Sequence, residues 1–240
     1  MKKKLFLLLL VAVAAWQLYS RDPSIRAPEA GVKFSYVVRT TGDAGGKDRL
    51  PMLVAMHGNG DTAEHFFDTA LNQLSVPARV ILLKGPLPHG TGDAWPWSPE
   101  DFEKYGPGVN EAIERLSVRY PTAGDPVLLG FSGGAMMAYY QAARHGECYS
   151  GVIAVSGRLN ENQLGGAVKR SDATVLGWHG TGDSVVPIGG GKHAVAMLQT
   201  AGVDARLHEF EGGHLGIFQD VKLEITQAIE RELDRAAKDF

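Results

Sequence analysis

The sequence predicts an α/β protein with a mostly parallel central sheet and helices on both faces. Short apolar runs alternate along the chain with segments of helical periodicity, and this alternation is typical of βα units. Several apolar runs end in glycine-rich loops, as strands do where they lead into helices. The chain has 240 residues, of which 44% are hydrophobic and 21% charged, so it can bury a substantial core. About seven strands fit this length.

The period of the apolar residues and the length of each run assign the individual strands and helices. Strands are expected over 34–39, 50–56, 79–83, 127–131, 152–155, the run from residue 174, and 205–210. Helices are expected over 63–74, with Asp61 or Thr62 as the cap, directly after residue 132, and over 106–120, where Val109, Ile113 and Leu116 share one face. Ile225, Ile229 and Leu233 mark an amphipathic helix near the C-terminus.

The N-terminal residues differ from the rest of the chain. Lys2, Lys3 and Lys4 precede an apolar run over 5–16, which is the pattern of a secretory signal peptide. Residues 12–14 offer a cleavage site before Ala15; the alternative is an uncleaved inner-membrane anchor over 5–19. We therefore expect a signal peptide or anchor over 1–20, export to the periplasm or beyond, a linker over 21–31, and a catalytic domain over 32–240.

Composition excludes several classes of protein. The formal net charge of −3 gives no electrostatic reason to bind nucleic acid. Cys148 is the single cysteine, so no intrachain disulfide can form, and no His/Cys cluster has metal-ligand spacing. The sequence predicts neither metal nor cofactor, and it does not determine the oligomeric state.

Ser132 lies in a run that joins an expected strand to an expected helix. Gly130-Phe131-Ser132-Gly133-Gly134 has the Gly-x-Ser-x-Gly pattern of a nucleophile elbow. Such a turn strains the serine backbone, and a Cβ two residues to either side would collide with the strand or the helix. The motif predicts an exposed serine hydroxyl. The alternative is an ordinary glycine-rich βα turn, which would have a similar sequence.

Two further residues fit the chemistry that this serine needs. A serine hydroxyl attacks an acyl carbon only if a neutral imidazole takes its proton and an acid orients that imidazole. Asp183 follows an expected strand, whereas Asp172 and Asp204 precede strands and belong to the opposite edge. His214 follows the next strand, so Ser132, Asp183 and His214 stand in the order that the nucleophile elbow requires.

The developing oxyanion requires preorganised N–H donors. The backbone of Gly133, directly after the serine, is the first candidate. The loop after strand 50–56 reads His57-Gly58-Asn59-Gly60, and Asn59 is the second candidate. His57 precedes the serine, and we interpret it as a histidine that holds this loop.

An aromatic loop follows the expected strand 79–83. It contains Trp95-Pro96-Trp97-Ser98-Pro99 and starts at the edge where Ser132 is expected. We interpret Trp95 and Trp97 as a stiff, substrate-binding wall of the pocket; simple packing is the alternative.

These motifs together resemble the phospholipase/carboxylesterase family of α/β-hydrolases, which includes bacterial carboxylesterases and acyl-protein thioesterases. The resemblance spans about residues 50–216 and is carried by the blocks 57–62, 130–136, 152–157, 179–187 and 212–214. It implies an α/β-hydrolase fold, a triad of Ser132, Asp183 and His214, and oxyanion donors at Asn59 and Gly133. The family usually has glutamine where this chain has Gly133, an apolar residue where it has Asn59, and Trp–Phe–Asp where it has Trp95-Pro96-Trp97.

The expected activity is that of a carboxylesterase-like serine hydrolase acting on a small-molecule ester through an acyl-enzyme. Thioesterase, lysophospholipase, polyester-oligomer hydrolase and peptidase activities stay open, as does a hydrolase fold kept as a non-catalytic binding domain. Only 51 residues separate Ser132 from Asp183 (183 − 132), which leaves little room for a lid domain. We therefore expect no separate lid and a preference for short to medium acyl chains.

Overall fold

A computed structural model describes residues 23–238 and contains an eight-stranded sheet. The spatial order of the strands is β1-β2-β4-β3-β7-β8-β9-β10. Their bounds are β1 Ser24–Ala27, β2 Val32–Thr41, β3 Met52–Met56, β4 Ala78–Leu83, β7 Val127–Phe131, β8 Gly151–Val155, β9 Thr174–Gly180 and β10 Ala205–Phe210.

Six neighbouring strands of this sheet, in the spatial order β4-β3-β7-β8-β9-β10, run parallel to one another. β3 pairs in parallel with β4 on one side and β7 on the other, and β7, β8, β9 and β10 continue in the same direction. Only β1 and β2 are antiparallel to their neighbours. The carboxyl ends of six parallel strands therefore meet at one edge, where the loops after β3, β7, β8, β9 and β10 converge.

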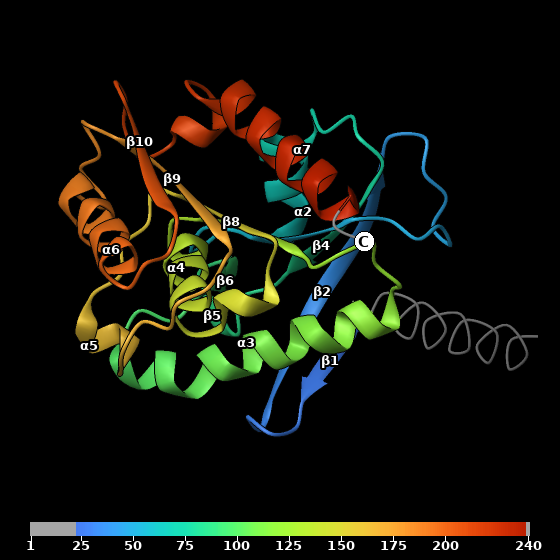
Figure 1. Ribbon diagram of the computed structural model, residues 1–240, viewed down its shortest axis with the longest axis horizontal. Helices are drawn as coiled ribbons and strands as arrows, with labels where there is room; N and C mark the ends of the chain where they lie inside the picture. The colour runs from blue at the N-terminus through green and yellow to red at the C-terminus, as the bar shows by residue number, and fades with distance from the viewer. Residues whose placement is uncertain (1–22, 239–240) are drawn as a thin grey trace, which may run out of the picture.

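Helices cover both faces of the sheet (Figure 1). Side chains of α3 (Pro99–Arg119), α4 (Gly133–His145) and α6 (Ile188–Thr200) pack into one apolar cluster. Those of α2 (Ala63–Phe66) and α7 (Lys222–Lys238) belong to a second cluster on the other face. The expected mostly parallel sheet between two helical layers is confirmed.

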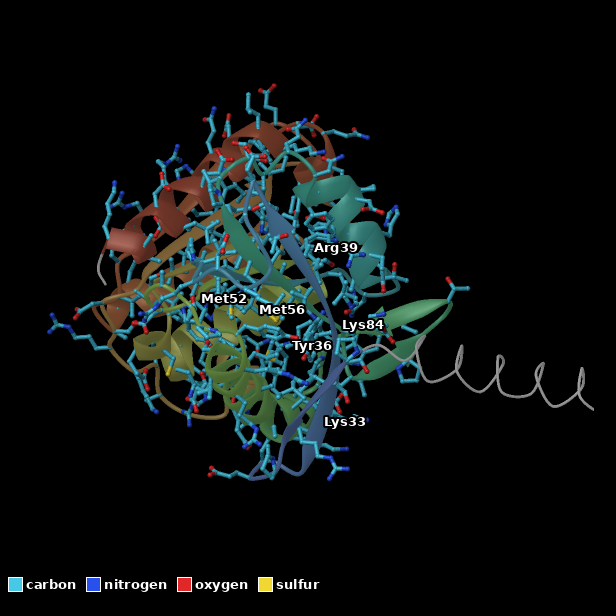
Figure 2. All side chains as sticks on the ribbon, turned by 90° about the vertical axis from the view of Figure 1, so that its right-hand side faces the viewer. Lys33, Tyr36, Arg39, Met52, Met56 and Lys84 are labelled. Atoms are coloured by element: carbon cyan, nitrogen blue, oxygen red, sulfur yellow. The ribbon has the colours of Figure 1, made fainter. Side chains whose placement is uncertain are left out.

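The central strands are buried on both sides. Every residue of β3 and of β7 is buried, as expected for parallel strands sandwiched between helices. Figure 2 shows Met52, Met56 and Tyr36 among the packed side chains of the interior, and all three are fully buried. The rigid centre of the sheet thus carries the loops that follow β3 and β7.

Helix α3 begins earlier than expected. The sequence predicts a helix over 106–120, but α3 begins at Pro99 and ends at Arg119. Ser98 caps it by accepting a hydrogen bond from the Asp101 N–H, and proline is well tolerated in the first turn. Pro107 interrupts the sequence pattern but stays inside the helix, because tertiary packing offsets the lost backbone bond.

Three further segments differ from the expectations. The predicted linker 21–31 is wrong in part, because Ser24–Ala27 forms β1 and buries Ile25 and Ala27. A two-stranded hairpin, β5 (Leu87–His89) with β6 (Gly92–Ala94), occupies part of the expected aromatic loop. The helix expected over 63–74 starts at the Thr62 cap as predicted, but changes to a π-helix over Phe67–Leu71 and ends there.

The predicted signal peptide or anchor over 1–20 lies outside the described residues. Within residues 23–238, none of the helices has the length and apolar character needed to cross a bilayer.

Candidate active site

Ser132 lies at the junction between β7 and α4, in a strained backbone conformation. Its φ of 53° and ψ of −115° place it in a region that side-chain-bearing residues seldom adopt. β7 ends at Phe131 and α4 begins at Gly133, so this single residue makes the turn. The hydroxyl is thereby raised above the carboxyl edge of the sheet, next to a helix N-terminus.

The flanking glycines are required by close backbone approach. A Cβ on Gly130 would lie 2.2 Å from the Gly134 carbonyl oxygen, and one on Gly134 would lie 2.2 Å from the Met56 carbonyl oxygen. Both collisions involve main chain, which cannot move aside as a flexible side chain can. The prediction that these two positions must be small is confirmed.

A continuous hydrogen-bonded chain joins the three predicted catalytic residues. His214 Nδ1 lies 2.8 Å from Asp183 Oδ2, and His214 Nε2 lies 2.9 Å from Ser132 Oγ. A carboxylate can only accept, so the imidazole proton is on Nδ1 and Nε2 is free to accept the serine proton. His214 is 82 positions from Ser132 and 31 positions from Asp183 in the sequence. The structure brings the three together in the geometry of a serine nucleophile, its general base and the acid that orients the base.

Asp183 is held by more groups than the sequence indicates. Its Oδ1 accepts hydrogen bonds from the N–H groups of Val185 and Val186, at 2.9 and 2.8 Å. His179 Nε2 lies 3.3 Å from Asp183 Oδ2 and donates to the Val186 carbonyl oxygen at 2.7 Å. His179 was missed as a site residue, although its position four residues before Asp183 at the end of β9 was an available signal.

Ser156 is a second residue that sequence reasoning missed. It follows β8, is fully buried, and has a positive φ of 54°. Its Oγ donates to the main-chain carbonyl of His214 at 3.0 Å, which fixes the loop that carries the imidazole. The signal was its place in Val155-Ser156-Gly157, at the same edge as Ser132.

Ser132 and His214 open into a cavity of about 1060 Å³ at the carboxyl edge. Its apolar lining residues include Trp97, Met136, Val185, Leu215 and Phe218. Its polar lining residues include Asp61, His65, Asp68, Thr69 and Asn72, which lie in or next to α2 and the π-helix that follows it. Such a cavity can hold the acyl part of a substrate against these apolar residues while the reacting carbon reaches Ser132.

The two tryptophans of the aromatic loop have different environments. Trp97 lines the cavity and is 57% exposed, as a residue on a substrate wall would be. Trp95 is 0% exposed and belongs to the core cluster beneath α3 and α4. The prediction that Trp95 forms the pocket wall is therefore wrong, because its side chain packs in this cluster and does not line the cavity.

His57 has the structural environment that was expected for it. The ring is 1% exposed, and burial lowers the pKa of His57 below its usual value. Nδ1 lies 2.8 Å from the Gly58 carbonyl oxygen, which makes Nδ1 the donor, and Nε2 accepts from the Gly85 N–H at 3.1 Å. His57 thus ties the loop that carries Asn59 to the segment after β4.

Asn59 and Gly133, the predicted oxyanion donors, lie side by side in the cavity wall with Ser132. Gly133 is the first residue of α4, so its N–H has no partner within the helix. The Asn59 side chain lies directly over Gly133, where a Cβ would approach Asn59 Oδ1 to 2.0 Å. Within 23–238, no protein acceptor faces the Asn59 N–H.

Sequence comparisons show which proteins this chain is similar to. The family described as Phospholipase/Carboxylesterase matches residues 100–227, just over half of the chain. NocK of Nocardia uniformis subsp. tsuyamanensis, whose name classes it with the esterases, is 32% identical over 117 residues. That match covers 45% of this chain and 33% of NocK, so the chain spans about a third of the length of this curated relative.

Solved structures share the fold over most of the chain. Esterase PE8 is 28% identical, with a TM-score of 0.71 over 84% of this chain and 100% of that chain. The Bacillus cereus carboxylesterase is 16% identical, with a TM-score of 0.71 over 85% of this chain and 97% of that chain. The second similarity shows the fold alone; together with the family match, these comparisons confirm the predicted α/β-hydrolase fold.

Proposed function

Because the chain belongs to the phospholipase/carboxylesterase family, we propose that it is a serine hydrolase that cleaves carboxylic esters of short to medium acyl chains through an acyl-enzyme. The observation that carries the proposal is the hydrogen-bonded chain from Ser132 through His214 to Asp183 on the wall of an open cavity.

The proposed acylation step uses the three side chains as they lie. Ser132 Oγ attacks the ester carbonyl carbon while His214 Nε2 takes the hydroxyl proton, and Asp183 stabilises the imidazolium that forms. Collapse of the tetrahedral intermediate breaks the ester C–O bond, and His214 returns the proton to the leaving alcohol. A water molecule then repeats the sequence on the acyl-serine, which releases the acid and restores Ser132.

The negative oxygen of each tetrahedral intermediate requires donors that are already in place. The backbone N–H groups of Asn59 and Gly133 are proposed for this role, because both lie next to Ser132 and lack protein acceptors in the described part of the chain. The N-terminus of α4 adds a favourable dipole at the same point.

The cavity supports a substrate with an apolar acyl group. Trp97, Val185 and Leu215 are 57%, 66% and 57% exposed around its mouth, so an acyl chain that contacts them removes apolar surface from water. An aliphatic ester or thioester of modest length fits this surface.

Replacing the nucleophile tests the proposal. Ser132→Ala removes one hydroxyl and should lower hydrolysis of a soluble aryl ester by several orders of magnitude, with an unchanged melting temperature. Asp183→Asn should lower kcat more than it raises KM, whereas the exposed Asp172→Asn at the opposite edge is the matched control and should leave turnover intact. Residual activity of Ser132→Ala above about a tenth of wild type would contradict the assignment.

A fluorophosphonate probe separates an enzyme from a non-catalytic binding domain. The probe should label wild-type protein at Ser132 and leave Ser132→Ala unlabelled. A wild-type protein that neither reacts with the probe nor hydrolyses any ester would favour the binding domain.

We also propose that the chain is exported, on the basis of Lys2–Lys4 and the apolar run that follows them. Mass spectrometry of protein from fractionated cells should find either a mature N-terminus near Ala15 or an intact chain in the membrane fraction. An intact chain in the cytosolic fraction would contradict both outcomes.

A further inference from the structure

The side chain of Asn59 is held in one orientation by a main-chain hydrogen bond. The N–H of Trp95 donates to Asn59 Oδ1 at 2.8 Å. Because a main-chain N–H can only donate, the carboxamide oxygen must face Trp95, and Nδ2 must occupy the other branch. Trp95 is fully buried, so the core holds the residue that carries this donor.

The same carboxamide lies against the residue that follows Ser132. A Cβ on Gly133 would come within 2.0 Å of Asn59 Oδ1 and 2.9 Å of Asn59 Nδ2. The Asn59 side chain therefore occupies the volume that any side chain at position 133 would need.

The Nδ2 group of Asn59 has no protein partner in the described part of the chain. It is not one of the buried polar atoms sealed from solvent. Asn59 lines the cavity together with Ser132 and Gly133. The result is an N–H donor whose orientation is fixed by the Trp95 N–H and which has no acceptor among the described residues.

We propose that Asn59 contacts the substrate through its side chain: Nδ2 donates a hydrogen bond to the carbonyl oxygen of the ester, beside the backbone N–H groups of Asn59 and Gly133. The inference rests on the proposed function of Ser132, because it requires an acyl group bound at that serine. A donor fixed in advance stabilises a developing negative charge without reorganising during the reaction.

Two substitutions at Asn59 separate the donor from the bond to Trp95. Asn59→Ala removes both and should lower kcat about 10²–10³-fold, the usual loss for one oxyanion donor. Asn59→Asp keeps an oxygen on the Trp95 N–H and the same shape but removes Nδ2, so its melting temperature should stay near wild type while kcat falls at least as far.

The new charge of Asn59→Asp requires its own control. Asn59→Leu has a side chain of similar size, carries no charge and offers no N–H donor. The kcat of Asn59→Leu should fall about 10²–10³-fold, as in Asn59→Ala, and a loss of this size cannot come from an added charge. An Asn59→Asp enzyme with kcat within threefold of wild type would overturn the donor role, even if Asn59→Ala were inactive.

A double-mutant cycle with Gly133 tests the contact independently of activity. Gly133→Ala should expel the Asn59 carboxamide and lower both melting temperature and kcat, but in an Asn59→Ala background the new methyl group has room. The double variant should therefore lose much less than the sum of the two single losses. Additive losses in melting temperature would refute the contact. Absence of hydrolysis and of probe labelling in wild type would instead refute the proposed function, while the melting temperatures would still test the contact.

Discussion

Three histidines at the carboxyl edge of the sheet differ in burial and hydrogen bonding. The His214 side chain is 11% exposed, and its Nε2 faces Ser132, so it can exchange a proton with a substrate. His179 is 0% exposed and lies against Asp183. His57 is sealed under the Asn59 loop, where one ring nitrogen donates and the other accepts. At the residue scale, hydrogen-bond partners and exposure distinguish the proposed base from two supporting rings.

The buried His57 should make stability fall in mild acid. Burial lowers the pKa of His57 in the folded state, whereas the unfolded chain takes up a proton below about pH 6.5. The contribution of neutral His57 to the free energy of unfolding is therefore fully present above that pH. It decreases as the pH falls towards the folded pKa, by at most about 1.4 kcal/mol per pH unit. Protonation would also remove the Nε2 acceptor of the Gly85 N–H.

His57→Gln tests this linkage by thermal unfolding between about pH 8 and about pH 5. The variant should melt lower at the upper pH, because its amide packs less well, but its melting temperature should change less across the series. Equal pH dependence in the two proteins would show that His57 does not contribute.

At the scale of elements, the beginning of α4 depends on glycine more than any other helix start that we describe. α4 follows β7 after a single residue, and Gly134 in its first turn lies against the main chain after β3. Gly189 is the second residue of α6, as Gly134 is the second residue of α4. A methyl group added at Gly189 would have no neighbouring atom within 4 Å. The two glycines share a helical position but differ in their surroundings.

Gly134→Ala and Gly189→Ala form a matched pair. The first places a methyl group 2.2 Å from the Met56 carbonyl oxygen and should lower the free energy of unfolding by about 1–3 kcal/mol or more. The second should be neutral or stabilising by up to about 1 kcal/mol, because alanine favours the helix. Denaturant unfolding measures both, and equal effects would contradict the close approach of β7, α4 and the loop after β3.

At the scale of the whole molecule, two apolar clusters hold the sheet between helical layers, and the cavity opens at its carboxyl edge. The chain from β7 to β10 holds α4, the short α5 (Glu161–Leu164) and α6 as its main helices. This stretch of the described chain contains no inserted domain that could close over Ser132. The apolar residues at the mouth stay open to solvent.

An open cavity should give ordinary saturation kinetics with soluble esters. Rates on short- and medium-chain esters should exceed those on emulsified long-chain triglycerides, because residues 23–238 include no lid that an interface could open. The measurement is the rate as a function of substrate concentration across the solubility limit. A jump above that limit would show interfacial activation, and a mobile covering segment would then have to exist.

Two of the family departures noted in the sequence, Asn59 and Gly133, prove to be neighbours in the structure. The sequence shows asparagine after His57-Gly58 and glycine after Ser132, 74 residues apart (133 − 59), with nothing to connect them. In the structure the two residues touch, and the asparagine carboxamide fills the space above the glycine. Pairing of this kind depends on how two loops approach, which a linear sequence does not express.

The sequence by itself determined the fold class, the strands from β2 to β10 of the main sheet, and the positions of Ser132, Asp183 and His214 at one edge. It could do so because apolar period, glycine at a strained turn and the order of residues after strands are local properties. Only the tertiary structure decided that Ser24–Ala27 joins the sheet, that Trp95 is core while Trp97 lines the cavity, and that His179 and Ser156 support the site. Those outcomes depend on which distant residues pack against a segment, and burial of this kind arises only once the two helical layers close on the sheet.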